Sequence, residues 1–207
     1  MWSATYTSIF TRAGVERILR FGFEQAMQRR KHLTSVTKSN AQRHGMVFWD
    51  AVFEEVRKDY PDVETDKMLV DAMTTRMVLN PKSLDTIVAT NLHADVLSDL
   101  AAALTGSLGI APTGNLRPEK DFPSMFEPIH GSAFDIIGKG VANPIGCFWS
   151  GAMMLEHLGE KAAADRLMAA VARVTGSREA VSPDLGGDAT TRQVTDAVLA
   201  AVRGAND

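Results

Sequence analysis

A strand that leads directly into a helix is the feature that most constrains how this chain can fold. The run 84–90 alternates in polarity and is rich in β-branched residues, which predicts a buried strand. The residues that follow, 91–104, carry apolar side chains at helical spacing. Such junctions are typical of α/β proteins, which place their ligands beyond the carboxyl ends of the strands.

The same alternation of strands and helices continues through the rest of the sequence. Further strands are expected at residues 32–37, 63–70, 109–111 and 124–126. One further helix is expected from the Thr11 N-cap to about residue 29, and a second is expected to end near Tyr60. The remaining helices are expected at 72–79, 145–158, 160–174 and 190–202. The segment between 105 and 143 is rich in Gly and Pro, and irregular stretches of this length usually have a binding role. The pattern predicts an α/β fold.

The composition excludes several classes of partner. With 207 residues, of which 45% are hydrophobic, the chain can form one large or two small domains. Its net charge of -3 gives no electrostatic reason to expect nucleic acid or an anionic membrane as a partner. Cys147 is alone, which excludes an internal disulfide, and its apolar surroundings predict a buried thiol. We see neither a secretory signal nor a membrane-spanning run, and expect a cytoplasmic protein.

Two carboxylates near the start of the 91–104 helix form the first candidate site. Asp95 and Asp99 are four residues apart and share one helix face, where like charges repel by roughly a few tenths of a kcal/mol. The helix dipole offsets part of this repulsion, and a hard cation such as Mg²⁺ would offset far more. The alternative is a pair of acidic residues in a solvated first turn.

Two other expected strands also end in candidate groups. Lys38 follows the strand 32–37 and Asp71 follows the strand 63–70; the alternatives are a surface lysine and a helix N-cap. The loop 127–135 carries Gly, Ser and His beside an acid, so it either wraps a nucleotide through its backbone or is a structural turn. The sequence has no Gly-x-Gly-x-x-Gly fingerprint, Walker-type phosphate loop or nucleophile elbow.

Three separated motifs resemble those of a known enzyme family. Residues 91–99, 126–136 and 140–144, in this order, are similar to motifs of the metal-dependent β-decarboxylating dehydrogenases, which include isopropylmalate, isocitrate, tartrate and (R)-malate dehydrogenases. The resemblance covers essentially the whole chain and implies the two-lobe α/β/α architecture of isopropylmalate dehydrogenase. The features that look most like tartrate and (R)-malate dehydrogenases are residues 37–40, the pair His93 and Ala94, and the stretch 115–126.

The resemblance implies a metal site that two subunits share. Asp95 and Asp99 look like the two ligands from one subunit, and Asp71 looks like the ligand that a homodimer supplies to the partner's site. A bound Mg²⁺ or Mn²⁺ would chelate the hydroxyl and carboxylate of a small 2-hydroxy diacid and act as a Lewis acid. Lys38, counted with Asp71 as catalytic, looks like the residue that helps to remove the hydroxyl proton.

The resemblance also implies an NAD site. Asn40 looks like a contact near the nicotinamide, and Asn143 looks like an adenine contact. Asp135 would accept hydrogen bonds from the ribose hydroxyls, and it would repel a 2′-phosphate by about 4 kcal/mol at contact distance, which favours NAD over NADP. The other residues of the adenosine loop would be His130, Gly131, Ser132, Ala133 and Ile136.

Two departures from the family pattern stand out. Phe134 replaces a residue that is generally Pro in the family. The residues around Ser8 match a point well inside the family's enzymes, so we expect the N-terminal part to be missing, with its substrate-binding arginines and its tyrosine acid. Residues 1–106 would then be part of the smaller lobe, with the dimer interface and the metal carboxylates, and 107–207 the second half of the nucleotide-binding lobe.

The leading hypothesis is the C-terminal part of an NAD- and Mg²⁺- or Mn²⁺-dependent enzyme that oxidises and decarboxylates tartrate or (R)-malate. The other hypotheses are a 3-isopropylmalate dehydrogenase, a non-catalytic homologue that acts by dimerising, and an enzyme whose missing half is a separate chain. Because the carboxylate-binding arginines are missing, we expect little activity from the chain alone.

Overall fold

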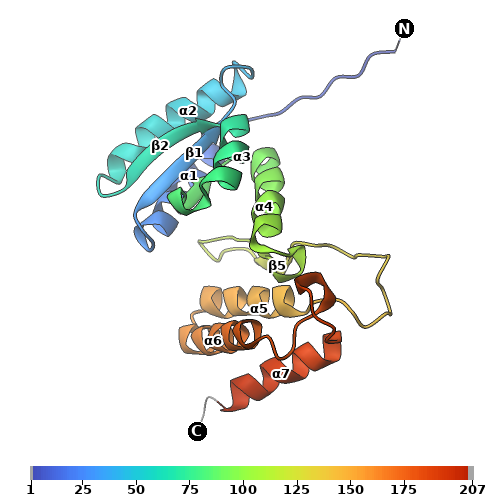
Figure 1. The fold of residues 1–207 in the computed structure, drawn as a ribbon. Coiled ribbons are helices and arrows are strands. Elements are labelled where there is room, and N and C mark those ends of the chain that lie inside the picture. Colours follow the sequence, from blue (N-terminus) through green and yellow to red (C-terminus); the bar gives the residue numbers. More distant parts are fainter. Residues whose placement is uncertain (1, 205–207) are drawn as a thin grey trace. The chain divides into compact units, whose positions relative to one another are not determined.

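The alternating strands and helices divide into two units in the computed structural model, which describes residues 2–204 (Figure 1). The first unit extends to Leu100 and the second begins at Ala101, so the boundary falls within helix α4 (Asn91–Thr105). The lobe boundary expected at residue 106 refers to the complete enzyme and stays a prediction. Among the described residues, no helix combines the length and the apolar character needed to cross a bilayer.

A parallel sheet of three strands is the centre of the first unit. Strand β1 (His32–Thr37) lies between β2 (Glu64–Leu69) and β3 (Thr86–Val88), and it is almost entirely buried. In the register, the first residue of β1 lies opposite the first residue of β2. Because all pairs are parallel, the carboxyl ends of the three strands share one edge. The strands expected at 32–37 and 63–70 are confirmed.

The expected strand at 84–90 keeps only its three central residues. On its amino side, the Asp85 carboxylate accepts hydrogen bonds at 3.0 Å from Arg29 Nε and from the backbone N–H of Arg30. On its carboxyl side, the Thr90 carbonyl accepts a backbone hydrogen bond at the start of α4. The residues at both ends of the run thus make hydrogen bonds to side chains or within a helix, and they do not pair with a neighbouring strand.

Helices α1 (Arg12–Met27) and α2 (Gly45–Val56) pack against the sheet and close the core of the first unit. Thr11 caps α1 as expected, because its Oγ1 accepts a first-turn N–H at 3.2 Å. Gly22 brings α1 close to the sheet, since a Cβ there would lie 3.3 Å from Val88. The buried core consists of Val15, Leu19, Phe23, Ala26, Leu33, Met46, Trp49, Val52, Phe53, Val56, Val63 and Val88. Short 3₁₀ turns follow at Arg57–Asp59, after α2, and at Pro81–Ser83, after α3 (Val70–Leu79).

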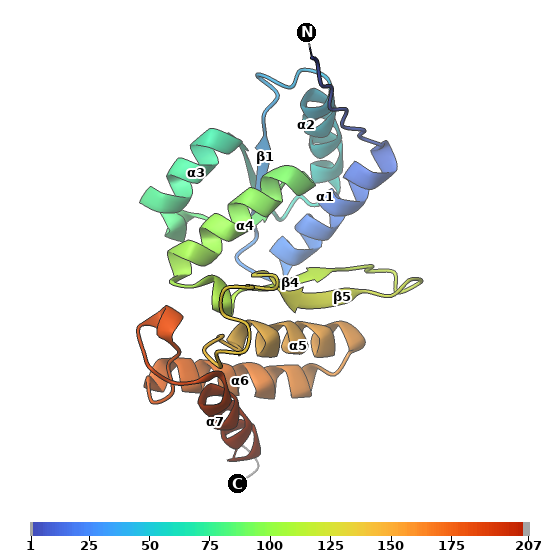
Figure 2. The ribbon, with the colours of Figure 1, turned by 90° about the vertical axis from the view of Figure 1, so that its right-hand side faces the viewer.

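The second unit combines a hairpin with a layer of helices (Figure 2). Strands β4 (Pro112–Asn115) and β5 (Met125–Pro128) pair antiparallel and contact α5 (Ile145–Leu158). Helix α5 packs against α6 (Lys161–Ser177), which packs against α7 (Thr191–Arg203). The buried core of this unit consists of Ile145, Ala170, Val171, Val174, Ala189, Val194, Val198 and Ala201.

Two expectations for the second unit are wrong. The strand expected at 109–111 is replaced by a 3₁₀ turn, Leu108–Ile110, because the Ser107 hydroxyl accepts a hydrogen bond from the N–H of Gly109 at 2.8 Å and bends the chain. Cys147 is exposed, not buried. Its helix buries a different face, which consists of Ile145, Gly146, Ser150 and Ala152.

Candidate functional site

The carboxyl edge of the first unit's sheet is where the predicted polar residues are placed. Lys38 comes directly after β1, and Asp71 lies in the first turn of α3, directly after β2. Helix α4 follows β3 and carries His93, Asp95 and Asp99. In α/β proteins this edge of a parallel sheet is the usual place for a ligand.

An ion pair joins the groups that follow β1 and β2. Lys38 Nζ donates to Asp71 Oδ1 at 2.6 Å, and the two side chains are 26% and 65% exposed. The hydrogen bond from Lys38 holds the pKa of Asp71 below its ordinary value. The alternative role of Asp71 as an N-cap is wrong, because Leu69 occupies the cap position and makes no side-chain cap. The carboxylate is instead directed to the lysine.

The two carboxylates of α4 stay exposed to solvent. Asp95 and Asp99 lie one helical turn apart, inside a helix that begins at Asn91, as the spacing predicts. No salt bridge to either carboxylate is found within residues 2–204. Over the same range, no three His, Cys, Asp or Glu side chains come together in a way that could hold a metal ion. Within the described part of one copy, Asp95 and Asp99 therefore form a pair that no third acidic side chain joins.

His93 is the residue of this edge to which the sequence assigned no role. It is only 9% exposed, and its buried Nδ1 has no hydrogen-bond partner in the part of the chain that is described. Burial, and to a smaller extent the positive charge of Lys38, lowers the pKa of His93. Both effects favour the neutral imidazole. Its spacing of four from the buried Leu97 is the signal that could have predicted its burial.

The predicted cofactor residues fall into two groups. Asn40 lies in the exposed turn after β1, in the first unit. The adenosine loop lies in the second unit, where residues 130–136 form successive turns with largely exposed side chains. Two of them have positive φ, +65° at Gly131 and +43° at Ala133. Turns that contain such positive-φ residues are among the backbone conformations that bind anions in proteins.

Asn143 differs from this loop because it is buried and its side-chain amide is hydrogen-bonded through both its oxygen and its nitrogen. It is 7% exposed, its Oδ1 accepts from the N–H of Ile145 at 3.0 Å, and its Nδ2 donates to Asp184 Oδ2 at 3.0 Å. The side-chain amide keeps one further N–H and one further acceptor lone pair. No local sequence signal marks Asp184, because its partner Asn143 is 41 positions away.

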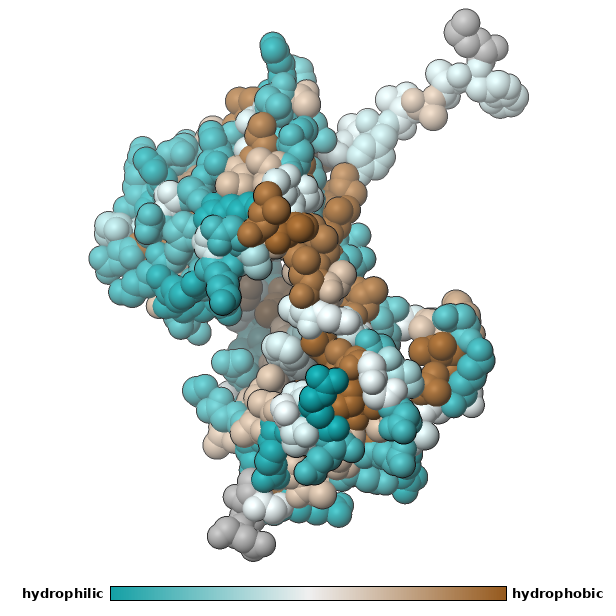
Figure 3. Space-filling model, in the orientation of Figure 1, coloured by the Kyte–Doolittle hydropathy of each residue, from teal (hydrophilic) through white to brown (hydrophobic). Residues whose placement is uncertain are grey.

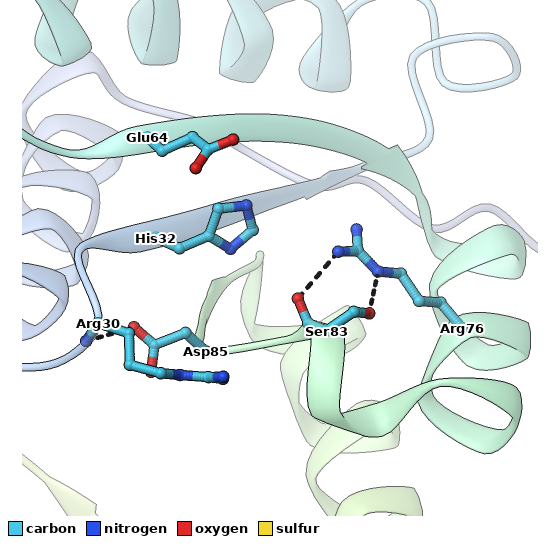
Figure 4. Close-up of a pocket in the computed structure, with 6 residues that line it drawn as sticks. All are labelled: Arg30, His32, Glu64, Arg76, Ser83 and Asp85. Atoms are coloured by element: carbon cyan, nitrogen blue, oxygen red, sulfur yellow. Dashed lines mark hydrogen bonds and ion pairs between the residues drawn. The ribbon is translucent and has the colours of Figure 1, made fainter.

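A cavity of about 360 Å³ opens at the other end of the sheet, where the strands begin (Figure 4). It is lined by charged and polar residues that already bind one another: Arg76 donates to Ser83 and to Asp66, and Asp85 accepts from Arg30. The cavity is part of an ion-pair network at the amino edge of the sheet. Its lining contains none of the predicted site residues, and consists of Arg30, His32, Glu64, Arg76, Ser83 and Asp85.

Comparison with known proteins identifies the family of the chain. The isocitrate/isopropylmalate dehydrogenase family matches residues 2–198. The chain belongs to this family. A probable tartrate dehydrogenase/decarboxylase of Agrobacterium vitis is 68% identical over 203 residues, which cover 98% of this chain and 56% of the relative. The D-malate dehydrogenase (decarboxylating) of Escherichia coli and the tartrate dehydrogenase/decarboxylase of Pseudomonas putida are each 49% identical, over 92% of this chain and 54% of their own length.

Solved structures of the family confirm the expected fold. Isocitrate dehydrogenase from Methylococcus capsulatus superimposes with a TM-score of 0.90 at 40% identity, over 95% of this chain and 58% of that one. A β-decarboxylating dehydrogenase from Thermococcus kodakarensis gives a TM-score of 0.81, also at 40% identity, over 95% and 57%. The chain thus has the family's fold and spans little more than half the length of the family members it matches.

Proposed function

We propose that this chain carries the metal-binding part and half of the nucleotide-binding part of a dehydrogenase that oxidises and decarboxylates tartrate or (R)-malate. The observation that carries the proposal is the placement of Lys38, Asp71 and the two α4 carboxylates after the three parallel strands of one sheet. The relatives support the reaction class, because they are named as dehydrogenases and decarboxylases of tartrate and D-malate.

The acidic residues fit a hard divalent cation. Asp95 and Asp99 offer carboxylate oxygens from one helix face, and Mg²⁺ and Mn²⁺ prefer such ligands in proteins. When bound, the cation would polarise the hydroxyl and carboxylate oxygens of the substrate. We assign Asp95 and Asp99 to the cation on one subunit and Asp71 to the cation of the partner.

A second copy of the chain would complete this site. Helices α3 and α4 both expose apolar side chains, which association would remove from water, and Figure 3 shows apolar residues gathered over these helices. The exposed residues are Val78, Leu79, Leu92 and Val96. The last two flank Asp95, so an interface over them would bring the partner close to the metal carboxylates.

Lys38 would accept the proton of the substrate hydroxyl while the hydroxyl carbon is oxidised. The neighbouring His93 is buried, which lowers its pKa and so favours the uncharged imidazole.

NAD is the proposed oxidant. Asp135 lies exposed in the loop 130–136, where its carboxylate would accept hydrogen bonds from ribose hydroxyls. A 2′-phosphate at the same place would meet a like charge, so NADP should bind more weakly than NAD. Asn40, in the turn beside Lys38, would face the nicotinamide end.

Binding of Mn²⁺ tests the metal site without requiring catalysis. Titrations followed by the electron paramagnetic resonance of free Mn²⁺ should show at least a roughly tenfold weaker affinity for Asp95→Asn and for Asp99→Asn than for the unchanged chain. Asp165→Asn is the matched control, because Asp165 is exposed on α6 and pairs with Lys161 at 3.1 Å. The same affinity in all four proteins would contradict the proposed site. NAD reduction with tartrate or (R)-malate then tests the reaction itself.

A non-catalytic protein that associates with a second copy is the other candidate function. The exposed apolar residues of α3 and α4 favour association whether or not the chain catalyses a reaction. Light scattering that shows a dimer, together with no measurable Mn²⁺ or NAD binding, would favour this function over the first.

A further inference from the structure

One carboxylate in the second unit joins three segments that are far apart in the sequence. Oδ2 of Asp184 accepts hydrogen bonds from the Ser107 hydroxyl and, at 3.0 Å, from Nδ2 of Asn143. Asp184 lies at the surface, in the 3₁₀ turn η4 (Pro183–Leu185), whereas Ser107 and Asn143 are 9% and 7% exposed. The carboxylate is therefore the acceptor for two donors that have little access to water.

The carboxylate is held in its ionised form. Partial burial would raise the pKa of Asp184, but hydrogen bonds from Ser107, Ser182 and Asn143 outweigh burial and hold the pKa below its ordinary value. Hydrogen bonds to an ionised acceptor are roughly twice as strong as neutral ones. The close approach also requires a glycine, since a Cβ on Gly109 would lie 2.8 Å from Asp184 Oδ2.

The segment 140–143 is fixed at both of its ends. At one end, the amide of Asn143 is bound between Asp184 and the first turn of α5. At the other end, Thr191 at the start of α7 donates its N–H to the Gly140 carbonyl at 2.8 Å and its hydroxyl to the Ala142 carbonyl at 2.6 Å. The side chain of Asn143 and the main chain of this segment are therefore held in one arrangement.

We propose that Asp184 is a positioning residue for the adenine nucleotide. It fixes the orientation of Asn143, and with it the segment 140–143, against which the adenine would bind. This inference rests on the proposed function, which places the adenosine half of NAD at this segment. Loss of the Asp184 carboxylate would free Asn143 to turn and would release the segment from one of its two attachments.

AMP is the probe that tests this inference, because it contains the adenosine end of NAD and needs neither metal nor catalysis. In calorimetric titrations of the full chain, Asp184→Ala should raise the Kd for AMP by roughly tenfold or more, which corresponds to losing one charge-assisted hydrogen-bond arrangement. Asp184→Asn retains one acceptor oxygen and should give a smaller rise. Asp188→Asn, an exposed carboxylate in the same loop, is the matched control and should bind AMP like the unchanged chain.

Hydrogen exchange separates positioning from a general loss of structure. In Asp184→Ala, backbone amides of 138–146 should exchange at least roughly tenfold faster, while those of β1 and its neighbours in the first unit keep their protection. Mn²⁺ affinity should stay unchanged. Equal AMP affinity in Asp184→Ala and the unchanged chain would overturn the inference and leave the proposed function intact. A chain that binds Mn²⁺ but no AMP, before any substitution, would overturn the nucleotide part of the proposed function and the inference with it.

Discussion

Single carboxylates hold together segments whose own hydrogen bonds are few. Asp85 is the clearest example, because its side chain is 2% exposed and accepts from Arg29 and from the backbone of Arg30 just before β3. Burial would raise the pKa of Asp85, but the hydrogen bonds and charges of these arginines outweigh it and lower the pKa. At this scale the sequence predicted the residues at the carboxyl edge, since each follows a recognisable strand. It could not predict Asp85 or Asp184 as anchors, because Ser107 is 77 positions from Asp184 and no local pattern joins them.

Asp85 should make stability depend on pH in the acid range. Because its pKa is lowered in the folded state, its contribution is present above the ordinary carboxyl pKa of about 4 and disappears as the pH falls through the lower folded value. Asp85→Asn should therefore reduce the free energy of unfolding by about 2 kcal/mol near neutral pH and by much less in strong acid. Urea unfolding at both pH values measures this, with the exposed Asp62→Asn as the control. A loss of equal size at both pH values would exclude the ionised carboxylate as the cause.

Helices were predicted better than strands because their signals are local. Thr11 and Thr190 cap α1 and α7 through contacts within four residues, and Thr190 forms a full capping box with Gln193. Strands depend on partners elsewhere in the chain. The expected strand at 109–111 therefore gave way to a turn that one nearby hydroxyl, Ser107, could stabilise.

Two glycines of the second unit should respond in opposite directions to the same substitution. Gly159 ends α5 with φ of +92°, a conformation that costs an alanine roughly 1 kcal/mol. Gly176 lies inside α6 with open space around its Cα, where alanine should add up to about 1 kcal/mol of helix propensity. Thermal unfolding should show a lower Tm for Gly159→Ala and an equal or higher Tm for Gly176→Ala. A similar decrease in Tm for both variants would contradict the view that the positive φ of Gly159 makes it the more sensitive of the two glycines.

The chain as a whole spans 56% of the length of its Agrobacterium vitis relative. Within residues 2–204, its acidic candidates lie as one Asp95–Asp99 pair and one separate Asp71. Family motifs predicted the fold over nearly the whole chain. The prediction that two copies share a metal rests on the family resemblance alone. No pattern in one sequence encodes which surface of the chain contacts a second copy.

Mixing two variants that each bind little Mn²⁺ should restore part of the Mn²⁺ binding if two copies of the chain share the site. A dimer of one Asp71→Asn chain and one Asp95→Asn chain would contain one intact set of carboxylates and one set broken twice. With random pairing, the mixture should therefore bind about a quarter as much Mn²⁺ as the unchanged chain, while either variant alone binds little. Equilibrium dialysis at a fixed total concentration measures this capacity. A mixture that binds no more than the separate variants would assign all three ligands to a single copy or to none.

The 2.6 Å bond between Lys38 and Asp71 also has a consequence for metal binding. In a single copy of the chain, the charge of this carboxylate is already matched by the neighbouring lysine. In the proposed function, a cation bound by Asp71 would compete with Lys38 for the same carboxylate oxygens. Binding of the metal would then release the Lys38 side chain from its partner and leave it able to turn towards the substrate.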